Sequence, residues 1–326
     1  MNKFLKLVII SIISILGLYY AFKGEDLANL IMHIKNVDFK NFLFAIFVLL
    51  ISCLVRAYRW NLIMRPFTSI SYGNVLSATM IGYFGNGVLA FRLGELLKAY
   101  SVANKNSITT AQAFGTVVLE RLLDIITLLA IIVLLIPWFP FEYDMIKYSV
   151  LVFSALTIIA IIILYIFSKY NLIKKYNKFV SNDSKSKKKI FSSISNIFDG
   201  FTSLKANKEI SMIIFSSIIL WIIYLFETMI IVRACNLDFN IIDSGIILVI
   251  GSIALGIPAL PGSAGTYDAG LKYSLEWIFQ VPGDIALNYA IISHFIAYFP
   301  CLLIGLIYFL ISNIKINDIK SIEIEN

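Results

Sequence analysis

Charged side chains stand at helical spacing within apolar stretches of this chain. The segment VLAFRLGELLKAY places Arg92 and Glu95 three residues apart, and VVLERLLDIITLL places Glu120 and Asp124 four residues apart. Residues at these spacings share one face of a helix. Because the planar guanidinium of arginine holds phosphate oxygens in a bidentate geometry, these residue types are suited to binding an anionic headgroup.

Two further arginines, Arg56 and Arg59, lie three residues apart in SCLVRAYRW, and Arg121 follows Glu120 directly. A charge at the centre of a membrane helix costs about 2.5–3.5 kcal/mol. Three unpaired charges around Glu120 would cost roughly 8–10 kcal/mol, comparable to the stability of a whole domain. We expect these charges to pair with one another, to pair with Arg92 and Glu95, to bind a ligand, or to lie nearer the membrane interface. For Arg59 and Arg65, snorkelling to the inner interface is an equally good interpretation.

A motif rich in glycine and proline, ALPGSAGTYDAG, follows late in the chain. Proline breaks the hydrogen bonding of a helix, and irregular backbone at membrane depth persists only where it is buried in protein or lines a wet cavity. The motif therefore joins the charged residues as part of a candidate site. The candidate substrate-binding residues are Arg56, Arg59, Arg92, Glu95, Glu120, Arg121, Asp124, Pro261, Gly262, Gly265 and Asp268.

The composition places these residues in an integral membrane protein. The chain of 326 residues is 59% hydrophobic and 14% charged, whereas soluble domains carry roughly 25% charged residues. The net charge of +7 comes from one lysine-rich loop and does not indicate nucleic-acid binding. The cysteines Cys53, Cys235 and Cys301 and the histidines His33 and His294 are isolated in sequence, so we expect no metal site, no histidine-based catalytic cluster and no cofactor.

Six segments are long and apolar enough to predict spanning helices. The lysine-rich loop 169–210 is predicted to be cytoplasmic by the positive-inside rule. Counting spans from this loop places both termini in the cytoplasm, and it also places residues 92–111 in a cytoplasmic flank. The predicted spans are 4–22, 41–60, 112–136, 146–168, 211–234 and 286–312.

Two further apolar stretches, 73–91 and 244–279, are interrupted by glycine or proline. The charge-derived orientation predicts that each enters and leaves the membrane on one side, as a re-entrant helical hairpin. The fold class is therefore an all-α polytopic membrane protein, with six spanning helices and two re-entrant hairpins. These form an inverted-topology repeat of 1–136 and 146–312 within a single domain, an arrangement that many secondary transporters use. The alternatives are that both stretches cross fully, or that the glycines only permit close helix packing.

Four segments carry a resemblance to a known family: RAYRW, NGVLAFRLGELLKAY, LERLLD and ALPGSAGTYDAG, in this order. Together they resemble the lysylphosphatidylglycerol synthase transmembrane-region family, also called the flippase-like domain family, over nearly the whole chain. The resemblance implies the lipid-flipping part of such proteins as a stand-alone member. The domain that charges a lipid with an amino acid in fusion members is not expected here. Asp268 stands where the last motif usually has glutamate.

Three classes of function are compatible with these observations. The first is a transporter that moves an anionic phospholipid or a polyprenyl-phosphate-linked lipid between leaflets of the plasma membrane, with no enzymatic reaction of its own. No GxxxxGK[ST] motif occurs, so any drive is expected from gradients or from consumption of the product. The second is a membrane-embedded transferase or phosphatase acting on a lipid carrier. The third is a non-catalytic scaffold. A homo-oligomer or a lipid-synthesising partner enzyme is compatible with each.

Overall fold

The computed structural model describes residues 3–89, 92–139, 208–256 and 261–312, with isolated residues at 148, 151, 152, 155, 158, 159 and 314. Helices are its only regular structure within these ranges, which agrees with the all-α prediction. The helices are α1 (Lys3–Phe22), α2 (Leu27–Lys35), α3 (Phe39–Met64), α4 (Tyr72–Val88), α5 (Gly94–Ala103), α6 (Thr110–Leu135), α10 (Ile210–Ala234), α11 (Ile241–Gly256), α12 (Thr266–Phe279) and α13 (Gly283–Ile311), with short 3-10 turns η2 (Ile136–Trp138) and η5 (Pro261–Ser263).

Five of the six predicted spanning segments are helices in the described part of the chain. By length and composition, α3, α10 and α13 are able to cross a membrane, and each has 25 to 29 residues. Helix α6 is equally long but carries the charged residues around Glu120. The predicted span 146–168 lies outside the described residues apart from six isolated positions, as does nearly all of the loop 169–210.

The starts of α3 and α6 each have a local cause. The Asp38 side chain accepts hydrogen bonds from the backbone N–H groups of Lys40 and Asn41, which begins α3. Thr109 and Gln112 form a reciprocal capping box at the start of α6. Such caps satisfy backbone donors that a helix start leaves without partners. These two caps therefore fix where the charge-bearing helices begin.

The prediction of a hairpin folded within 73–91 is wrong. Helix α4 runs unbroken over Tyr72–Val88, and the returning limb is α5, which begins at Gly94. The glycines of α4 do not break the helix because their role is close packing: a Cβ on Gly85 would lie 2.7 Å from the Cα of Gly94. Residues 94–103 form a helix that packs against α4, and the side chains of Leu97 and Lys98 are buried.

Because α4 and α5 are in close contact, one methyl group added at Gly94 is expected to lower the stability of the protein. A Cβ on Gly94 would overlap the carbonyl oxygen of Gly82 and the backbone nitrogen of Asn86. Gly94→Ala should lower stability by about 1–3 kcal/mol, the usual effect of overpacking. Gly73→Ala on α4 meets no atom within 4 Å and should leave stability unchanged or slightly higher. Thermal unfolding in detergent micelles compares the two, and equal melting temperatures would show that the α4–α5 contact is loose.

The second interrupted stretch is a hairpin, as predicted. Helices α11 and α12 pack against each other, and the turn between them contains η5 and the motif glycines. Gly262 and Gly265 adopt φ values of 75° and 87°, which side chains rarely tolerate. The tip reaches neighbouring helices: η5 contacts α4, and a Cβ on Gly265 would overlap the Ser14 carbonyl oxygen of α1.

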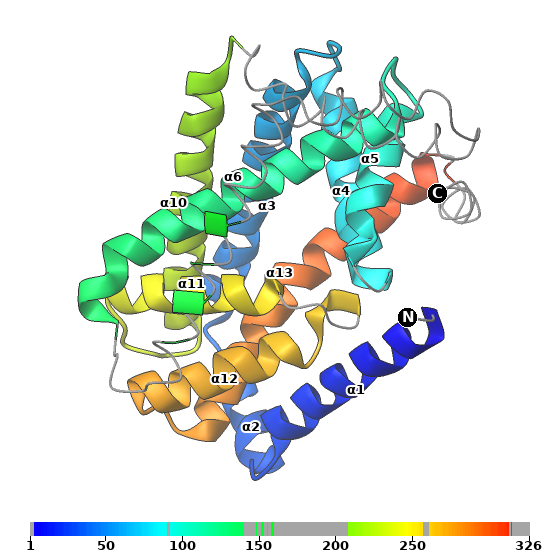
Figure 1. The fold of residues 1–326 in the computed structure, drawn as a ribbon. Helices are drawn as coiled ribbons and strands as arrows, with labels where there is room; N and C mark the ends of the chain where they lie inside the picture. Colours follow the sequence, from blue (N-terminus) through cyan, green and yellow to red (C-terminus); the bar gives the residue numbers. More distant parts are fainter. Residues whose placement is uncertain are drawn as a thin grey trace.

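The helices of the two halves pack in matching pairs (Figure 1). Helix α3 contacts α4 as α10 contacts α11, α5 contacts α6 as α12 contacts α13, and α4 contacts α13 as α11 contacts α6. Helices α3 and α10 lie side by side and antiparallel, since Asp38 bonds to Ala234 at one end and Arg65 pairs with Glu209 at the other. The charged residues of α3 and α6 therefore come together beside α10 at the centre of this arrangement.

Candidate functional site

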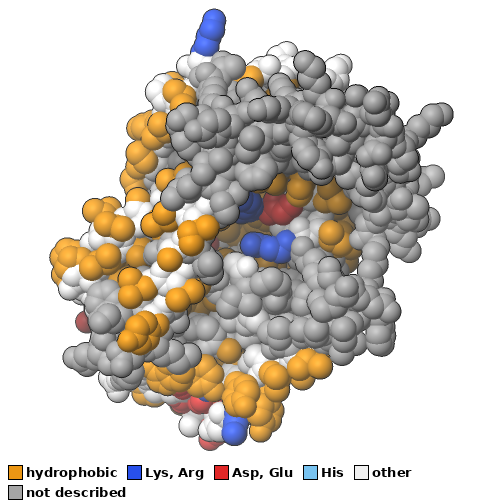
Figure 2. Space-filling view, viewed as in Figure 1, with side chains coloured by type: hydrophobic (Ala, Val, Ile, Leu, Met, Phe, Trp, Pro, Cys, Tyr) orange, Lys and Arg blue, Asp and Glu red, His pale blue; other side chains and the backbone are white. Residues whose placement is uncertain are grey.

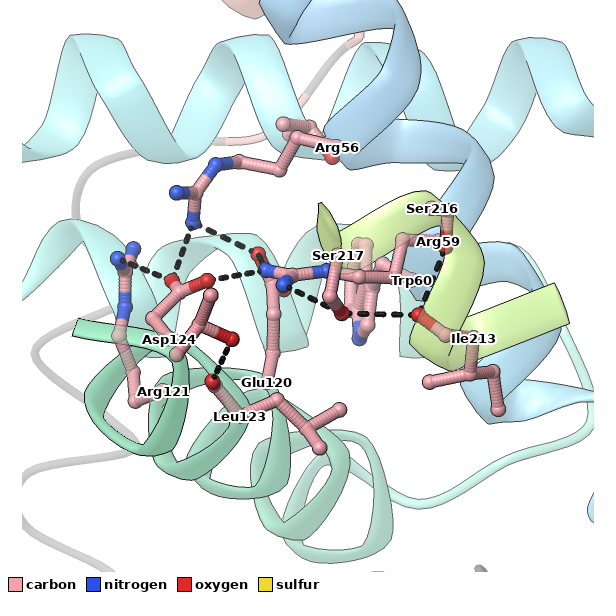
Figure 3. A network of polar contacts seen from close by, with 12 residues as sticks. Arg56, Arg59, Trp60, Glu120, Arg121, Leu123, Asp124, Ile213, Ser216 and Ser217 are labelled. Atoms are coloured by element: carbon pink, nitrogen blue, oxygen red, sulfur yellow. Dashed lines mark hydrogen bonds and ion pairs between the residues drawn. The ribbon is translucent and has the colours of Figure 1, made fainter. Parts of the chain in front are cut away.

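Glu120 lies at the centre of a buried charge network between α3, α5 and α6 (Figure 3). Its carboxylate accepts from the Lys98 ammonium at 2.6 Å and from the Arg56 guanidinium at 2.9 Å, and Arg59 lies 3.6 Å away. Glu120 and Arg59 have no exposed surface. Three cations thus surround one fully buried carboxylate, which satisfies part of the pairing that the sequence requires.

Asp124 lies one turn further along α6 and shares the same cations. It accepts from Arg59 at 2.6 Å and from Arg56 at 3.1 Å, and Arg121 lies 3.5 Å away. Arg121 is also bonded to Glu95 of α5. The predicted residues of α3, α5 and α6 therefore converge in one cluster, because i, i+4 spacing puts both acids on the same face of α6.

Four members of this network were not among the sequence candidates. Lys98 is bonded to Glu120 and lies 4.1 Å from the centre of the Trp60 ring. From α10, the Tyr224 hydroxyl accepts from Arg56 at 2.8 Å, and Ser217 accepts from Arg59 at 3.1 Å. Lys98 could have been found from its i+3 spacing to Glu95. The α10 hydroxyls gave no such signal, because an apolar helix pattern does not show which helix it will meet.

The arginines at the end of α3 divide into two kinds. Arg59 is fully buried and does not snorkel. Arg65 is 46% exposed at its side chain and pairs with Glu209 at 2.7 Å. The pair joins the end of α3 to the start of α10, so these two helix ends lie at one end of the molecule. Arg65 therefore lies outside the buried cluster and provides a matched control for it.

Arg92 is the cation of this region with the fewest partners. It lies at the turn between α4 and α5 with φ 56°, in the left-handed region. No hydrogen bond or ion pair joins it to another residue in the described ranges. Its electrostatic neighbours are Arg121 and Arg56, which repel it, and Glu95 and Tyr298, which attract it. Arg92 thus carries a charge near the cluster and has no ion-pair partner among the described residues.

The cluster carries an excess of positive charge. Five cations face three carboxylates in the described region, so two positive charges are not balanced by protein groups. Burial of unbalanced charge is costly in a low-dielectric environment. The cations are Arg56, Arg59, Arg92, Lys98 and Arg121, and the carboxylates are Glu95, Glu120 and Asp124.

A small pocket of about 10 Å³, roughly the space of one water molecule, lies beside this excess charge. Buried polar atoms near it have no hydrogen-bond partner in the described part: Nε of Arg121, Oε2 of Glu95 and Oδ1 of Asn86. Figure 2 shows one face of the molecule hollowed, with Lys or Arg and Asp or Glu side chains inside and hydrophobic side chains at the rim. The pocket is lined by Arg56, Thr79, Gly82, Tyr83, Asn86, Glu95, Lys98 and Arg121.

The candidates Pro261, Gly262, Gly265 and Asp268 form a separate group at the tip of the second hairpin. Asp268 accepts from the Gly265 N–H at 2.9 Å, which closes the start of α12. Its other oxygen lies 2.7 Å from Nδ1 of His294, whose Nε2 lies 2.7 Å from the Gly262 carbonyl oxygen. The expectation that His294 is isolated is therefore wrong: α13 carries it to the hairpin tip from a distant part of the sequence.

The buried thiols are also closer in space than in sequence. Cys53 of α3 and Cys301 of α13 have their sulfur atoms 3.5 Å apart, and Cys235 is buried elsewhere. Among the described residues, no three side chains of His, Cys, Asp or Glu converge as metal ligands would.

Comparisons with known proteins agree with the resemblance in the motifs. The sequence profile of the Lysylphosphatidylglycerol synthase TM region family matches residues 4–305. A UPF0104 membrane protein of Methanocaldococcus jannaschii is 23% identical, and the match covers 96% of each chain. A UPF0104 membrane protein of Pyrococcus horikoshii is 26% identical, over 94% of this chain and 96% of its own. No solved structure matches this chain.

Proposed function

Because the chain belongs to the Lysylphosphatidylglycerol synthase TM region family and is a membrane protein, we propose that it moves an anionic lipid between the two leaflets. The lipid is a phospholipid or a polyprenyl-phosphate-linked lipid. Its phosphate is held by the charge cluster, with the Arg92 guanidinium as the first group to meet it. Arginine suits this role because its fork matches phosphate oxygens.

The observation that carries this proposal is the excess of two positive charges beside the pocket. Arg56, Lys98 and Arg121 line the pocket against the carboxylate of Glu95. A phosphate group brings one or two negative charges, so its entry would balance the cluster. A sugar or a cation would leave that excess in place or increase it. The carboxylates hold the cations together when no phosphate is bound.

A lipid needs an apolar route for its acyl or polyprenyl chains, and the outer faces of the helices offer one. Helices α10 and α13 expose a continuous series of large apolar side chains while burying their other faces. Apolar surfaces of this kind are stable in contact with the hydrocarbon core of a membrane. The exposed apolar residues include Ile214, Phe215, Ile218, Ile222 and Phe226 on α10, and Leu303, Ile307, Leu310 and Ile311 on α13.

We propose in addition that α4–α5 and α11–α12 are re-entrant hairpins of an inverted-topology repeat. The matching helix contacts support this, as does the antiparallel contact of α3 with α10. Equivalent helices of opposite direction are what an inverted repeat requires. We place the Arg65–Glu209 end, and with it both termini, on the cytoplasmic side of the plasma membrane.

The proposal is tested by lipid flipping in reconstituted vesicles. Fluorescent phosphatidylglycerol and fluorescent phosphatidylcholine report transfer by the loss of inner-leaflet protection from dithionite. We expect the protein to accelerate the anionic probe several-fold more than the zwitterionic probe. An excess of unlabelled polyprenyl phosphate should slow the anionic probe if polyprenyl lipids share the site, and should leave it unchanged if phospholipids are the substrate. Equal rates for both probes, or rates equal to empty vesicles, would overturn the proposal.

The alternatives make different predictions in the same vesicles. A lipid-carrier enzyme would need a base or nucleophile, and both ring nitrogens of the buried His294 are already bonded to Asp268 and Gly262. Such an enzyme would change the covalent structure of the added lipid, and thin-layer chromatography of the recovered lipid would detect the change. A scaffold would neither flip nor alter it.

A further inference from the structure

His294 lies between two hydrogen-bond acceptors. Its Nδ1 is 2.7 Å from a carboxylate oxygen of Asp268, and its Nε2 is 2.7 Å from the carbonyl oxygen of Gly262. A carbonyl oxygen only accepts, and so does an ionised carboxylate. Two hydrogen bonds therefore need two protons, whereas a neutral imidazole carries one. The observed geometry holds one proton more than a neutral histidine beside an ionised aspartate.

This additional proton has two possible positions, and the number of protons held by the two side chains is the same in both. Either the ring is an imidazolium that donates from both nitrogens, or Asp268 is protonated and donates to Nδ1. The second oxygen of Asp268 is already engaged by the Gly265 N–H at 2.9 Å. If the proton leaves, two lone pairs face each other at 2.7 Å. The neutral ring keeps the stronger bond to the charged carboxylate, so the contact with Gly262 is the one that is lost.

The contact with Gly262 is what fastens the hairpin tip to α13. Gly262 and Ser263 have φ values of 75° and 58°, a conformation held by its surroundings rather than by local preference. Ser263 adds one further polar contact to α13, with the Tyr298 hydroxyl at 3.3 Å. The tip itself touches α4 through η5. Loss of the proton therefore frees the tip at the point where the second hairpin meets the first.

The groups that face His294 do not supply the missing donor. The rings of Tyr267 and Tyr298 lie 5.1 and 5.2 Å from the imidazole, and the Tyr267 hydroxyl is bonded to Ser293. From α10 the nearest carboxyl group is Glu227, which acts on Tyr267. Helix α4 has no charged residue. The arginines of α3, Arg56 and Arg59, belong to the charge cluster, and Lys40 lies at the start of α3, beside its cap residue Asp38. His294, which lies between Asp268 and Gly262, is therefore the group whose second proton the tip geometry requires.

We propose that Asp268 and His294 form a proton-binding site that couples protonation to docking of the hairpin tip, and thereby makes lipid transport proton-dependent. The inference rests on the proposed transport function, and it names the coupling ion. Helix α4 connects the two sites, since η5 contacts it and it carries the pocket residues Thr79, Tyr83 and Asn86. The His294 side chain is 17% exposed, so protons are able to exchange with it. The tip is docked when the pair is protonated and released as the pH rises.

Hydrogen exchange of the tip amides, residues 262–270, tests the coupling without transport. We measure protection factors in detergent between pH about 5 and about 8.5, a range that brackets ordinary histidine titration. In the wild type, protection should fall roughly tenfold or more as the pH rises, as expected for loss of a hydrogen bond that involves a charged group. His294→Gln should show low protection at every pH, because the amide does not titrate.

Asp268→Asn should have the opposite effect to His294→Gln and keep the tip amides protected from exchange. Its amide N–H donates to Nδ1 of a neutral ring, whose Nε2–H then donates to Gly262, while the amide oxygen still accepts from Gly265. The tip should stay protected across the whole pH range. A merely structural role for Asp268 would instead give low protection. His33→Gln is the matched control: His33 also pairs with an aspartate, Asp284, at 3.2 Å but has no second acceptor among the described residues, so this variant should behave like the wild type.

Flipping of the anionic probe is then followed over the same pH range. Transport with a pH dependence that disappears in both His294→Gln and Asp268→Asn supports the coupling. Transport with an unchanged pH dependence in these variants, or tip protection that does not vary with pH in the wild type, overturns it. If tip protection varies as expected but no lipid is flipped, the proton site stands and the transport function fails.

Discussion

Glu120→Gln should destabilise the protein by about 3–5 kcal/mol and abolish lipid transport, the effect of removing one partner from a buried ion pair. The Glu120 carboxylate accepts from Lys98 and Arg56 and lies beside Arg59, and it has no exposed surface. Glutamine keeps the shape but removes the charge, so five cations would face two carboxylates. Thermal unfolding in micelles and the flipping rate per folded molecule measure the two effects.

Glu209→Gln is the matched control for this change. Glu209 also pairs with an arginine, Arg65, but both side chains are more than one third exposed. Exposed pairs contribute at most about 1 kcal/mol, so the control should keep near-normal stability and transport. Normal flipping per folded molecule in the Glu120 variant would show that the charged cluster is architectural. The scaffold alternative makes that prediction, since the cluster would then serve folding alone.

Arg92→Gln should reduce transport of the anionic probe roughly tenfold or more, the change expected for loss of a hydrogen bond to a charged group. Its stability should be unchanged or higher, because Arg92 has no ion-pair partner among the described residues and lies near two like charges, Arg121 and Arg56. A residue that binds substrate but is repelled by its neighbours in the substrate-free protein is expected to show such opposite effects on transport and stability. The same flipping assay and thermal unfolding measure both.

Two further variants identify the reason for an Arg92 effect. Arg92→Lys keeps the charge but loses the planar fork, so it should give intermediate transport if the phosphate is held in a bidentate manner. Arg65→Gln removes an arginine that is exposed at the end of α3 and should leave transport unaffected. If Arg92→Gln flipped the anionic probe at the wild-type rate, the guanidinium would not be part of the phosphate site.

Several features of this protein followed from the sequence alone. The arguments were its composition, the helical spacing of its charges and the free-energy cost of burying charge. The helices α1, α3, α6, α10 and α13 coincide with predicted apolar segments because length and hydropathy are local properties. The convergence of Glu120 and Asp124 with the arginines followed from their shared helix face and from the need of each intramembrane charge for a partner. The family followed from four short motifs in order.

Only the tertiary structure decided which groups complete each site. Whether the glycines of α4 break a helix or permit close packing depends on Gly94, a residue outside the interrupted stretch. Tyr224 and Ser217 join the cluster because α10 packs antiparallel to α3. His294 meets Asp268 because α13 passes the hairpin tip. Such contacts join residues that are distant in the chain, and hydrophobic periodicity shows which face of a helix is buried without showing what it is buried against.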